Sequence, residues 1–421
     1  PPRSTLFPYT TLFRSAQSNG GAYAARANGT FDHSAMFLNC TFASNTVYDP
    51  MSNGGAIAIG TVDTGLASAT LVNCVFSGNM AEESANAVVF QMGDTASLHC
   101  VNSVSDIGFS ANAFGVMGTP SVTVNANCVS SDPRFVGGLN GVIDSVTVYN
   151  STEGVTQLTL SSSVLAPNQL NGKFITFPGS MPIEFYIIRN TGSMLEIAGD
   201  VSSIGVTGGA NFSIRDYRIR YDSPCIDAGT DIYGVSTDIR GRTRFDDSNT
   251  ANVQSSIDIG CYEYRNWYVN PAAIGANNGS SWTDAHNELR NALTNPDLDS
   301  GDSIWVRSGT YKPTSDFDRT KSFNLPYGVA LFGGFATGAE TLLSQRNPSS
   351  NATVLSGDLN SDDTYSYALY LPTITNNSEN SYHVLIGAPA VRFDGFVIRG
   401  GNADGALDAS YGAGALFVFA Q

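Results

Sequence analysis

Apolar and polar residues alternate in short runs through the first third of the chain. Residues 38–42 follow this alternation as Leu-Asn-Cys-Thr-Phe, and residues 72–76 repeat it 34 positions later as Val-Asn-Cys-Val-Phe. A period of two puts alternate side chains on opposite faces of a β-strand. We therefore predict strands in which Leu38, Cys40 and Phe42 point inward and the polar residues between them point outward.

Other segments recur at the same interval. Asn-Gly-Gly-Ala at residues 19–22 returns at 53–56, and weaker copies of the repeat run through residues 87–100 and end at Cys128. A single strand cannot bury its apolar face, but copies stacked about 4.8 Å apart build a continuous core. The repeats predict a parallel β-helix, with the closing Asn of each Phe-x-x-Asn run in a left-handed turn. One inward column should hold Cys40, Cys74, Cys100 and Cys128.

A related period runs through the C-terminal third. Ile304, Val329 and Val354 are spaced 25 residues apart, which fits one turn of a parallel β-helix with loops of variable length. The strands predicted there are residues 267–269, 303–306, 329–332, 353–355, 391–393 and 396–398.

One helix is predicted just after the strand at residues 267–269. Trp282, Ala285, Leu289 and Leu293 follow helical spacing, and Ser281 with Asp284 three residues later resembles a capping box. We expect this helix to cover the open end of the second β-helix. The alternative is an ordinary surface helix.

The two repeat regions divide the chain into five segments. Between them, residues 137–216 carry alternating runs at 145–149, 157–160, 185–188 and 194–197 with Gly-rich turns, which indicates a small antiparallel β insertion. The predicted segments are 1–15, not native; 16–136, the C-terminal part of a first β-helix; 137–216, the insertion; 217–264, the closing segment of the first module; and 265–421, the N-terminal cap and first coils of a second, truncated β-helix.

The start of the chain differs from the rest. Residues 5–15 read Thr-Leu-Phe-Pro-Tyr-Thr-Thr-Leu-Phe-Arg-Ser, which is similar to the translation of a common sequencing-library adapter. Such a segment is set aside before fold reasoning, and the alternative is a genuine strand that contains a proline. We expect the natural N-terminus to be missing and the chain to be a fragment, so the lack of a signal peptide does not bear on localisation.

Composition agrees with many short strands joined by polar turns. Of 421 residues, 14% are charged and 43 are glycine, which suits long helices poorly. The net charge of −16 argues against nucleic acid and other anionic polymers as partners, because these require a basic face. No apolar run approaches the roughly 18 residues of a membrane-spanning helix, so none is expected.

Several motifs resemble known bacterial proteins. The Gly-Gly-Ala and Phe-x-x-Asn repeats resemble those of polymorphic outer-membrane proteins and related β-helix surface proteins. Ser-Pro-Cys-Ile-Asp-Ala-Gly at 223–229, Thr-Asp-Ile-Arg-Gly at 237–241 and Asp-Ile-Gly-Cys-Tyr-Glu at 258–263 are similar to the closing segment of choice-of-anchor β-helix proteins. The resemblance implies an all-β, right-handed parallel β-helix of the pectin-lyase-like kind, in two partial modules. It also implies an extracellular or outer-membrane-associated location on a bacterial cell.

This resemblance implies an adhesive, glycan-binding or structural role, with glycans or surface proteins as partners and no catalysis by this fragment. Its long, flat, polar outer face would present Asn, Thr and Ser side chains to such partners. The alternative is a polysaccharide lyase or glycoside hydrolase of the same fold. A hydrolase needs carboxylates from neighbouring coils, and adjacent acids occur only at 246–247 and 362–363. The four histidines share no motif, so we predict no catalytic residues.

A weak calcium candidate lies near the C-terminus, and no other cofactor is expected. Asp358, Asn360 and Asp362 place oxygen ligands at i, i+2 and i+4, as calcium loops do. The sixth position lacks Gly and the twelfth lacks Glu. The alternative, which we favour, is a solvated turn capped by its own Asp and Asn side chains.

Two cysteines depart from the pattern of the resembling proteins. Cys225 and Cys261 stand where those proteins usually carry Ala, and a disulfide between them would staple the closing segment. The alternative is two buried thiols. The same segment holds a set of charged residues whose spacing fits turn capping and ion pairs better than a functional site: Asp227, Asp238, Arg244, Asp258 and Glu263.

Overall fold

The computed structural model divides the chain into two compact units. Unit 1 consists of Pro1–Val136, Phe174–Phe185 and Arg215–Tyr264, and unit 2 of Gly137–Lys173, Tyr186–Ile214 and Arg265–Gln421. The structure describes residues 3–8, 11–12, 15–16, 21–28, 30, 32–47, 54–62, 64–81, 89–92, 96–109, 114–117, 121–161, 167–178, 183–368, 371–405 and 415–416.

Unit 1 begins with four parallel sheets, each named here for one of its strands. The β9 sheet holds β1 (Arg3–Pro8), β5 (His33–Leu38), β9 (Ala67–Val72), β13 (Ala96–Val101) and β16 (Ser121–Val124). The β10 sheet holds β2 (Thr11–Leu12), β6 (Thr41–Ala43), β10 (Val75–Ser77), β14 (Val104–Ser105) and β17 (Val129–Ser130). The β8 sheet holds β4 (Tyr23–Asn28), β8 (Ile57–Val62), β12 (Val89–Met92) and β15 (Phe114–Met117), and the β7 sheet holds β3 (Ser15–Ala16), β7 (Thr46–Val47) and β11 (Met80–Ala81).

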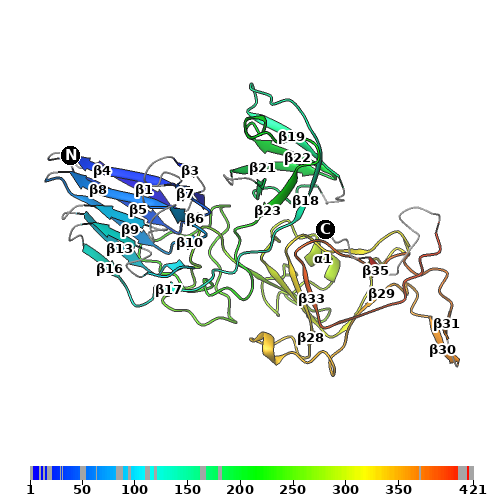
Figure 1. Cartoon of the computed structure of the whole chain (residues 1–421). Coiled ribbons are helices and arrows are strands. Elements are labelled where there is room, and N and C mark those ends of the chain that lie inside the picture. Colours follow the sequence, from blue (N-terminus) through cyan, green and yellow to red (C-terminus); the bar gives the residue numbers. More distant parts are fainter. Residues whose placement is uncertain are drawn as a thin grey trace. The chain divides into compact units, whose positions relative to one another are not determined.

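Strands enter these sheets in a repeating order along the chain. From β4 to β11 the chain visits the β8, β9, β10 and β7 sheets and then visits all four again. Each strand therefore lies parallel to the equivalent strand of the previous circuit, and Figure 1 shows them stacked side by side. The prediction of an all-β protein with parallel pairing between successive repeats is confirmed.

Register between circuits confirms the inward columns at Cys40 and Phe42. Phe42 lies opposite Phe76, and their rings stack with centroids 4.8 Å apart and planes inclined by 4°. Cys40 and Cys74 are fully buried in the same apolar cluster. Leu38 does not belong to that cluster, although it is buried. Phe37 takes the inward place on β5 instead.

The predicted column of four cysteines is wrong in one member. Cys100 lies opposite Leu71, whereas the position equivalent to Cys74 in the third circuit is Ser103, immediately before β14. The offset from β9 to β13 is 29 residues and not 34, so aligning cysteine with cysteine put the third circuit out of register. Cys128, immediately before β17, does return to the column of Cys74.

An asparagine in the left-handed conformation marks the corner between the β9 and β10 sheets in three successive circuits. Asn39, Asn73 and Asn102 all have φ between 43° and 53°. Asn73 Nδ2 donates to Asn39 Oδ1 over 2.7 Å, which links one corner to the next. Because this left-handed residue interrupts the period of two, the inward side passes from Phe37 to Cys40 and bypasses Leu38.

The closing Asn of the Phe-x-x-Asn run does not adopt the left-handed conformation that we predicted. In the first circuit Ser44 has φ 52°, and in the second Gly78 has φ 63°. The side chains of Asn45 and Asn79 are instead buried between circuits, where Asn45 Nδ2 donates to Asn79 Oδ1 over 2.7 Å. The amide thus joins neighbouring coils and does not cap its own turn.

The outer face of the β10 sheet is covered by the closing segment, residues 217–264. Val75 and Val104 pack against a cluster from that segment that includes Ile226 and Ile259. Thr41 points outward as predicted, but it is 1% exposed because the Cys261 backbone N–H donates to its hydroxyl. This part of the expected polar face therefore lies inside unit 1.

The outer face of the β9 sheet does carry a column of polar residues with partial access to solvent. Ser34, Ser68, Ser97 and Ser121 lie in register across β5, β9, β13 and β16. The first three are half-buried and the fourth is exposed. The expected polar outer face is thus present on one sheet and covered on the neighbouring one.

Residues 140–215 pair antiparallel, as predicted for this stretch, and close into a barrel. The strand order is β18-β19-β22-β21-β20-β23. The bounds are β18 (Asn140–Val146), β19 (Val155–Leu160), β20 (Phe174–Thr176), β21 (Glu184–Thr191), β22 (Met194–Ala198) and β23 (Asn211–Arg215), with a 3₁₀ turn at Ser202–Ile204. The predicted strand at 145–149 is misplaced, because β18 begins earlier and bulges between Ile143 and Ser145.

The C-terminal part of unit 2 holds three further parallel sheets and one hairpin. The β28 sheet contains β24 (Asn266–Val269), β25 (Ser303–Arg307), β28 (Ala330–Phe335) and β33 (Arg392–Asp394). The β29 sheet contains β26 (Gly309–Tyr311), β29 (Thr353–Ser356) and β34 (Phe396–Arg399), and the β32 sheet contains β27 (Phe323–Asn324), β32 (Leu385–Ile386) and β35 (Ala415–Leu416). β30 (Thr364–Ala368) pairs antiparallel with β31 (Leu371–Thr375), and a 3₁₀ turn spans Leu343–Gln345.

The six strands predicted here are present, but the 25-residue register is wrong. Ile304 lies opposite Leu331 and not Val329. Val354 belongs to a different sheet, where it pairs with Thr310 and Val397. Loops of unequal length between strands explain why equal spacing along the chain did not identify the true partners.

The predicted helix is shorter than its apolar spacing indicated. Helix α1 spans Leu289–Leu293, and its Leu289, Ala292 and Leu293 pack with the core next to β24. Ser281 Oγ does accept the Asp284 backbone N–H over 3.0 Å, as in a capping box. The return bond differs, because the Ser281 hydroxyl and not its backbone N–H donates to Asp284 Oδ2 over 3.1 Å. The helix does not begin there, because His286 pairs as an extended residue with β24.

Candidate functional site

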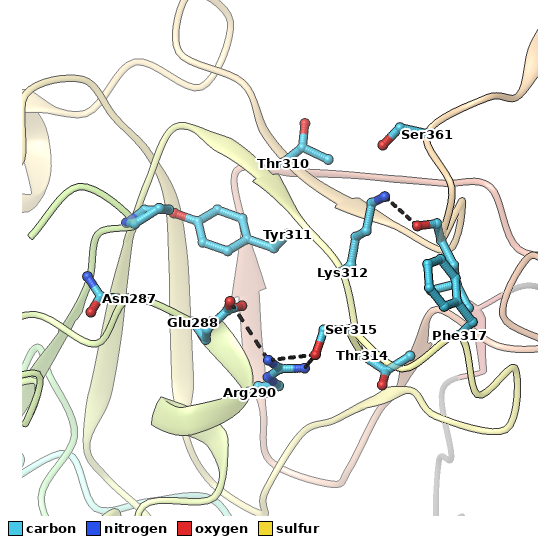
Figure 2. Close-up of a pocket in the computed structure, with 12 residues that line it drawn as sticks. Asn287, Glu288, Arg290, Thr310, Tyr311, Lys312, Thr314, Ser315, Phe317 and Ser361 are labelled. Atoms are coloured by element: carbon cyan, nitrogen blue, oxygen red, sulfur yellow. Dashed lines mark hydrogen bonds and ion pairs between the residues drawn. The ribbon is translucent and has the colours of Figure 1, made fainter.

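A pocket of about 460 Å³ opens in unit 2 between α1 and the loop that follows β26. Its lining is mixed, with two aromatic side chains among hydroxyl, amide and charged groups. The described lining residues are Pro271, Asn287, Glu288, Arg290, Thr310, Tyr311, Lys312, Thr314, Ser315, Phe317, Leu359 and Ser361 (Figure 2). A concave site with an apolar surface and a few polar groups is typical of small-ligand binding.

Phe317 is the exposed aromatic side chain of this pocket. It is 58% exposed and has φ 61°, a conformation that is strained for a residue with a Cβ. Polar groups on both sides hold the loop. Thr314 and Asp316 bond to each other, and Asp318 accepts the Thr320 backbone N–H over 2.9 Å. The loop therefore presents an aromatic face to solvent at a conformational cost.

Polar side chains of the pocket are anchored by bonds that leave some donors available. Lys312 Nζ donates to the Leu359 carbonyl over 2.7 Å, and an ammonium has three donors in all. Arg290 donates to Ser315 Oγ over 3.3 Å and lies 3.8 Å from a Glu288 oxygen. Two cations and one carboxylate thus line this site on a chain whose net charge is −16.

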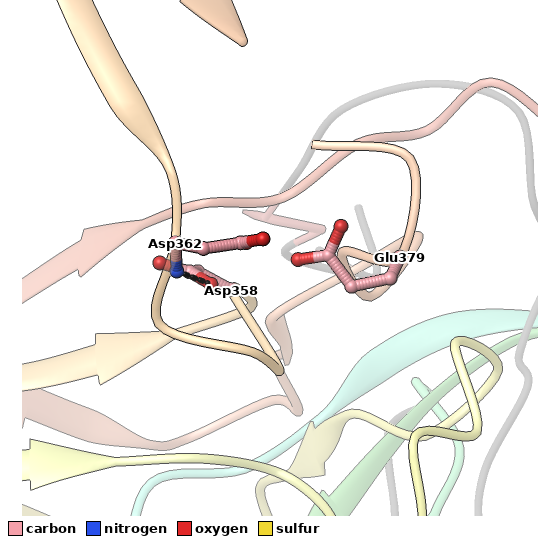
Figure 3. A group of neighbouring side chains, drawn as sticks. All are labelled: Asp358, Asp362 and Glu379. Atoms are coloured by element: carbon pink, nitrogen blue, oxygen red, sulfur yellow. Dashed lines mark hydrogen bonds between the residues drawn. The ribbon is translucent and has the colours of Figure 1, made fainter. Parts of the chain in front are cut away.

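Two of the predicted calcium ligands, Asp358 and Asp362, lie in one group of carboxylates. The carboxylates of Asp358, Asp362 and Glu379 lie within 4.8 Å of one another, and this is the one such group among the residues that the structure describes (Figure 3). Asn360, the third predicted ligand, is exposed. Glu379 lies 17 positions beyond Asp362, after the hairpin, so no local spacing could have identified it.

Asp358 serves chiefly as the cap of its own turn. Its Oδ1 accepts the backbone N–H of Ser361 over 2.6 Å and that of Asp362 over 3.2 Å, and its Oδ2 accepts that of Asp363 over 3.3 Å. These bonds occupy the oxygens that a cation would need. The three carboxylates could hold a calcium ion in place of such bonds, but the geometry favours the alternative of a capped turn.

The charged residues of the closing segment form ion pairs and caps, with one exception. Arg242 lies 3.0 Å from Asp238, and Arg244 pairs with Glu263. Asp258 accepts the backbone N–H of Tyr264 over 2.6 Å. The exception is Asp227, whose two carboxylate oxygens are buried without a hydrogen-bond partner among the described residues.

The candidate disulfide between Cys225 and Cys261 is not formed in the structure. All six cysteines are described, and none is disulfide-bonded. Cys225 packs with Val75 and Val104, whereas Cys261 packs in a separate cluster with Ala43 and Tyr262. Burial raises the pKa of the Cys225 thiol to about 12, so this thiol is inert while the segment stays closed.

Local packing and hydrogen bonds surround the adjacent acid pairs and His286. In the first pair Asp247 is buried and Asp246 exposed, and in the second Asp363 accepts from Asn380 Nδ2 over 3.0 Å. His286, stacked on Trp267 with centroids 6.5 Å apart, has a pKa lowered by burial. The residues that line the pocket were missed from sequence. An aromatic at 317 inside a polar loop was the available signal.

Comparison with known proteins identifies no relative, because no family model, curated protein or solved structure matches this chain. In the described part of the chain, no helix has both the length and the apolar character needed to cross a bilayer.

Proposed function

We propose that this is a bacterial, secreted or cell-surface protein with two partial right-handed parallel β-helices of the pectin-lyase-like kind. Its role is to bind glycans and not to cleave them. The repeated visit of successive strands to the same parallel sheets supports the β-helix. The sequence resemblance to β-helix surface proteins supports the location.

The pocket around Phe317 is the observation that carries the glycan-binding role. Phe317 offers a flat apolar face to the C–H side of a sugar ring, and Lys312 and Arg290 offer donors to its hydroxyl oxygens. The backbone strain at Phe317 persists only because surrounding bonds hold the loop, and such strain is common where function requires an exposed group.

The alternative is a polysaccharide lyase or glycoside hydrolase of the same fold. Hydrolysis uses two carboxylates on either side of the glycosidic bond, about 5 to 9.5 Å apart. Glu288 is the one carboxylate among the described lining residues, so the second carboxylate that hydrolysis uses is not among them. These features support binding over cleavage.

A glycan array probed with the chain, followed by calorimetry on the best ligands, tests the proposal. We expect weak binding that falls about tenfold in Phe317→Ala, a loss of about 1.4 kcal/mol. The matched control is Ile274→Ala, because Ile274 is 96% exposed and does not line the pocket.

Two results would contradict the proposal. Binding that survives Phe317→Ala unchanged would place the ligand elsewhere. Release of reducing ends or unsaturated products from a polysaccharide panel would favour the enzyme, and loss of that release in Glu288→Gln would place the chemistry in this pocket.

A further inference from the structure

Asp227 is a buried acidic side chain that no hydrogen bond to a described residue holds. Its residue exposure is 0%, and neither carboxylate oxygen has a hydrogen-bond partner among the described residues. The backbone has φ 50°, its N–H donates to Asp258 Oδ1 over 2.8 Å, and its carbonyl accepts the Val253 N–H over 2.9 Å. These bonds fix the main chain and leave the side chain uncompensated.

The neighbouring buried acids do not share this property. Asp247, Asp258 and Glu263 are between 1% and 4% exposed, and each accepts at least two hydrogen bonds. Leaving a carboxylate in such a place without a partner is costly, so native proteins pair it, protonate it or give it a metal ion. Asp227 therefore requires an explanation that the turn caps around it do not supply.

The charges that act on Asp227 are negative. Burial raises its pKa most, followed by the charges of Asp247, Asp246 and Glu263, and together they bring it to about 8. The Asp247 backbone N–H offsets part of this effect without reaching hydrogen-bond geometry. A site with buried oxygens and surrounding acids attracts a cation, and one proton would neutralise only one of these charges.

We propose that Asp227 is a ligand of a divalent cation of the calcium type, bound between the Asp227 turn and the loop that carries Asp246 and Asp247. Such ions take about six to eight oxygens from carboxylates, carbonyls and water. Asp246 is exposed, so the loop gives the ion and its waters access from solvent. The ion would tie the Asp227 turn to the loop that carries Asp246 and Asp247.

Alkylation of Cys225 in the full chain tests this site. The buried thiol lies two residues from Asp227 and reacts only when the segment opens. We expect about 10 mM calcium to slow the wild-type reaction by about 10- to 100-fold, given a Kd of about 10⁻⁴ to 10⁻³ M. Asp227→Asn should lose this protection while keeping the turn, since Asn tolerates a positive φ. The control Asp362→Asn, in the other acidic group, should keep it.

Two outcomes would overturn the site. If calcium protects Cys225 from alkylation equally in the wild type and in Asp227→Asn, the ion binds at another site. The second outcome is that calcium does not change the alkylation rate of the wild type, while the Asp227→Asn substitution itself slows alkylation. That result would show that Asp227 carries a proton and not a metal ion. If Asp227→Asn does not fold, hydrogen exchange measured on the wild type with and without calcium tests the site instead. Calcium must slow exchange in residues 225–263, and unchanged exchange there would refute the proposal.

Discussion

Replacing Glu184 by glutamine should change how the stability of unit 1 depends on pH. The Glu184 side chain is 3% exposed, and its Oε1 accepts the Tyr217 hydroxyl over 2.8 Å and lies 3.4 Å from Arg215 Nε. Its Oε2 has no partner among the described residues. Burial raises the pKa of this carboxyl from 4.5 to about 7, although Tyr217 and Arg215 both act to lower it.

A carboxyl with a raised folded-state pKa holds its proton more tightly in the folded protein. Below pH 4.5 it is protonated in both states, and as the pH rises from 4.5 to about 7 the unfolded state loses its proton first, so stability falls. Above that range the folded state bears a cost of about 3 kcal/mol. Glutamine stays neutral, so the free energy of unfolding of Glu184→Gln relative to wild type should rise by about that amount across this window.

Cysteine and tryptophan residues are distributed so that each unit has its own probe of unfolding. All six cysteines belong to unit 1 and all three tryptophans to unit 2. A brief alkylation pulse during urea unfolding therefore follows unit 1, while tryptophan fluorescence follows unit 2. Asp231→Asn likewise replaces an exposed carboxylate of unit 1 by its amide and serves as the control. A difference between Glu184→Gln and wild type that stays constant from about pH 5 to 8, or falls as pH rises, would refute the burial argument.

Three further substitutions test the packing and the pocket. Gly260→Ala should destabilise unit 1 by about 2 kcal/mol by the same alkylation assay. Gly260 has a φ of 111°, and a Cβ there would lie 3.1 Å from Val75 Cγ2. In the control Gly137→Ala the new Cβ meets nothing within 4 Å, so the stability of unit 2, followed by tryptophan fluorescence, should not change. Asn73→Ala should cost unit 1 about 3 kcal/mol, because it removes bonds to Asn39 and to the Thr230 backbone at a left-handed corner. Phe317→Gly should raise the stability of unit 2 by about 1 kcal/mol in tryptophan-monitored unfolding, yet weaken glycan binding, since it relieves a φ of 61°.

Periodic alternation identified strands well because each apolar face has to be buried. The strands around Cys40, Phe42 and Val306 follow from local pattern alone, as does parallel pairing between copies that keep a 34-residue spacing. Register was lost wherever the circuit length changed, as at Cys100 and Ile304, because loops carry no alternation and their lengths decide which residues meet.

The sites were harder to predict because they join distant positions. Thr41 and Asn73 read as solvent-facing, yet a segment more than 150 residues later covers them. Glu379 joins Asp358 only after the hairpin returns the chain. Alternation reports which face of a strand is apolar, and it contains nothing about which later segment will cover the polar face.

The cover over the β10 sheet has a consequence for synthesis. The last strand of that sheet ends at Ser130, and the first buried cluster residue after it is Ile219, with only the partly buried Phe135 in between. At about 5 to 20 residues per second, a ribosome needs roughly 4 to 18 seconds to deliver that stretch. Val75 and Val104 lack most of their cover during this interval, so for several seconds other chains can bind the apolar surface that the later residues will bury.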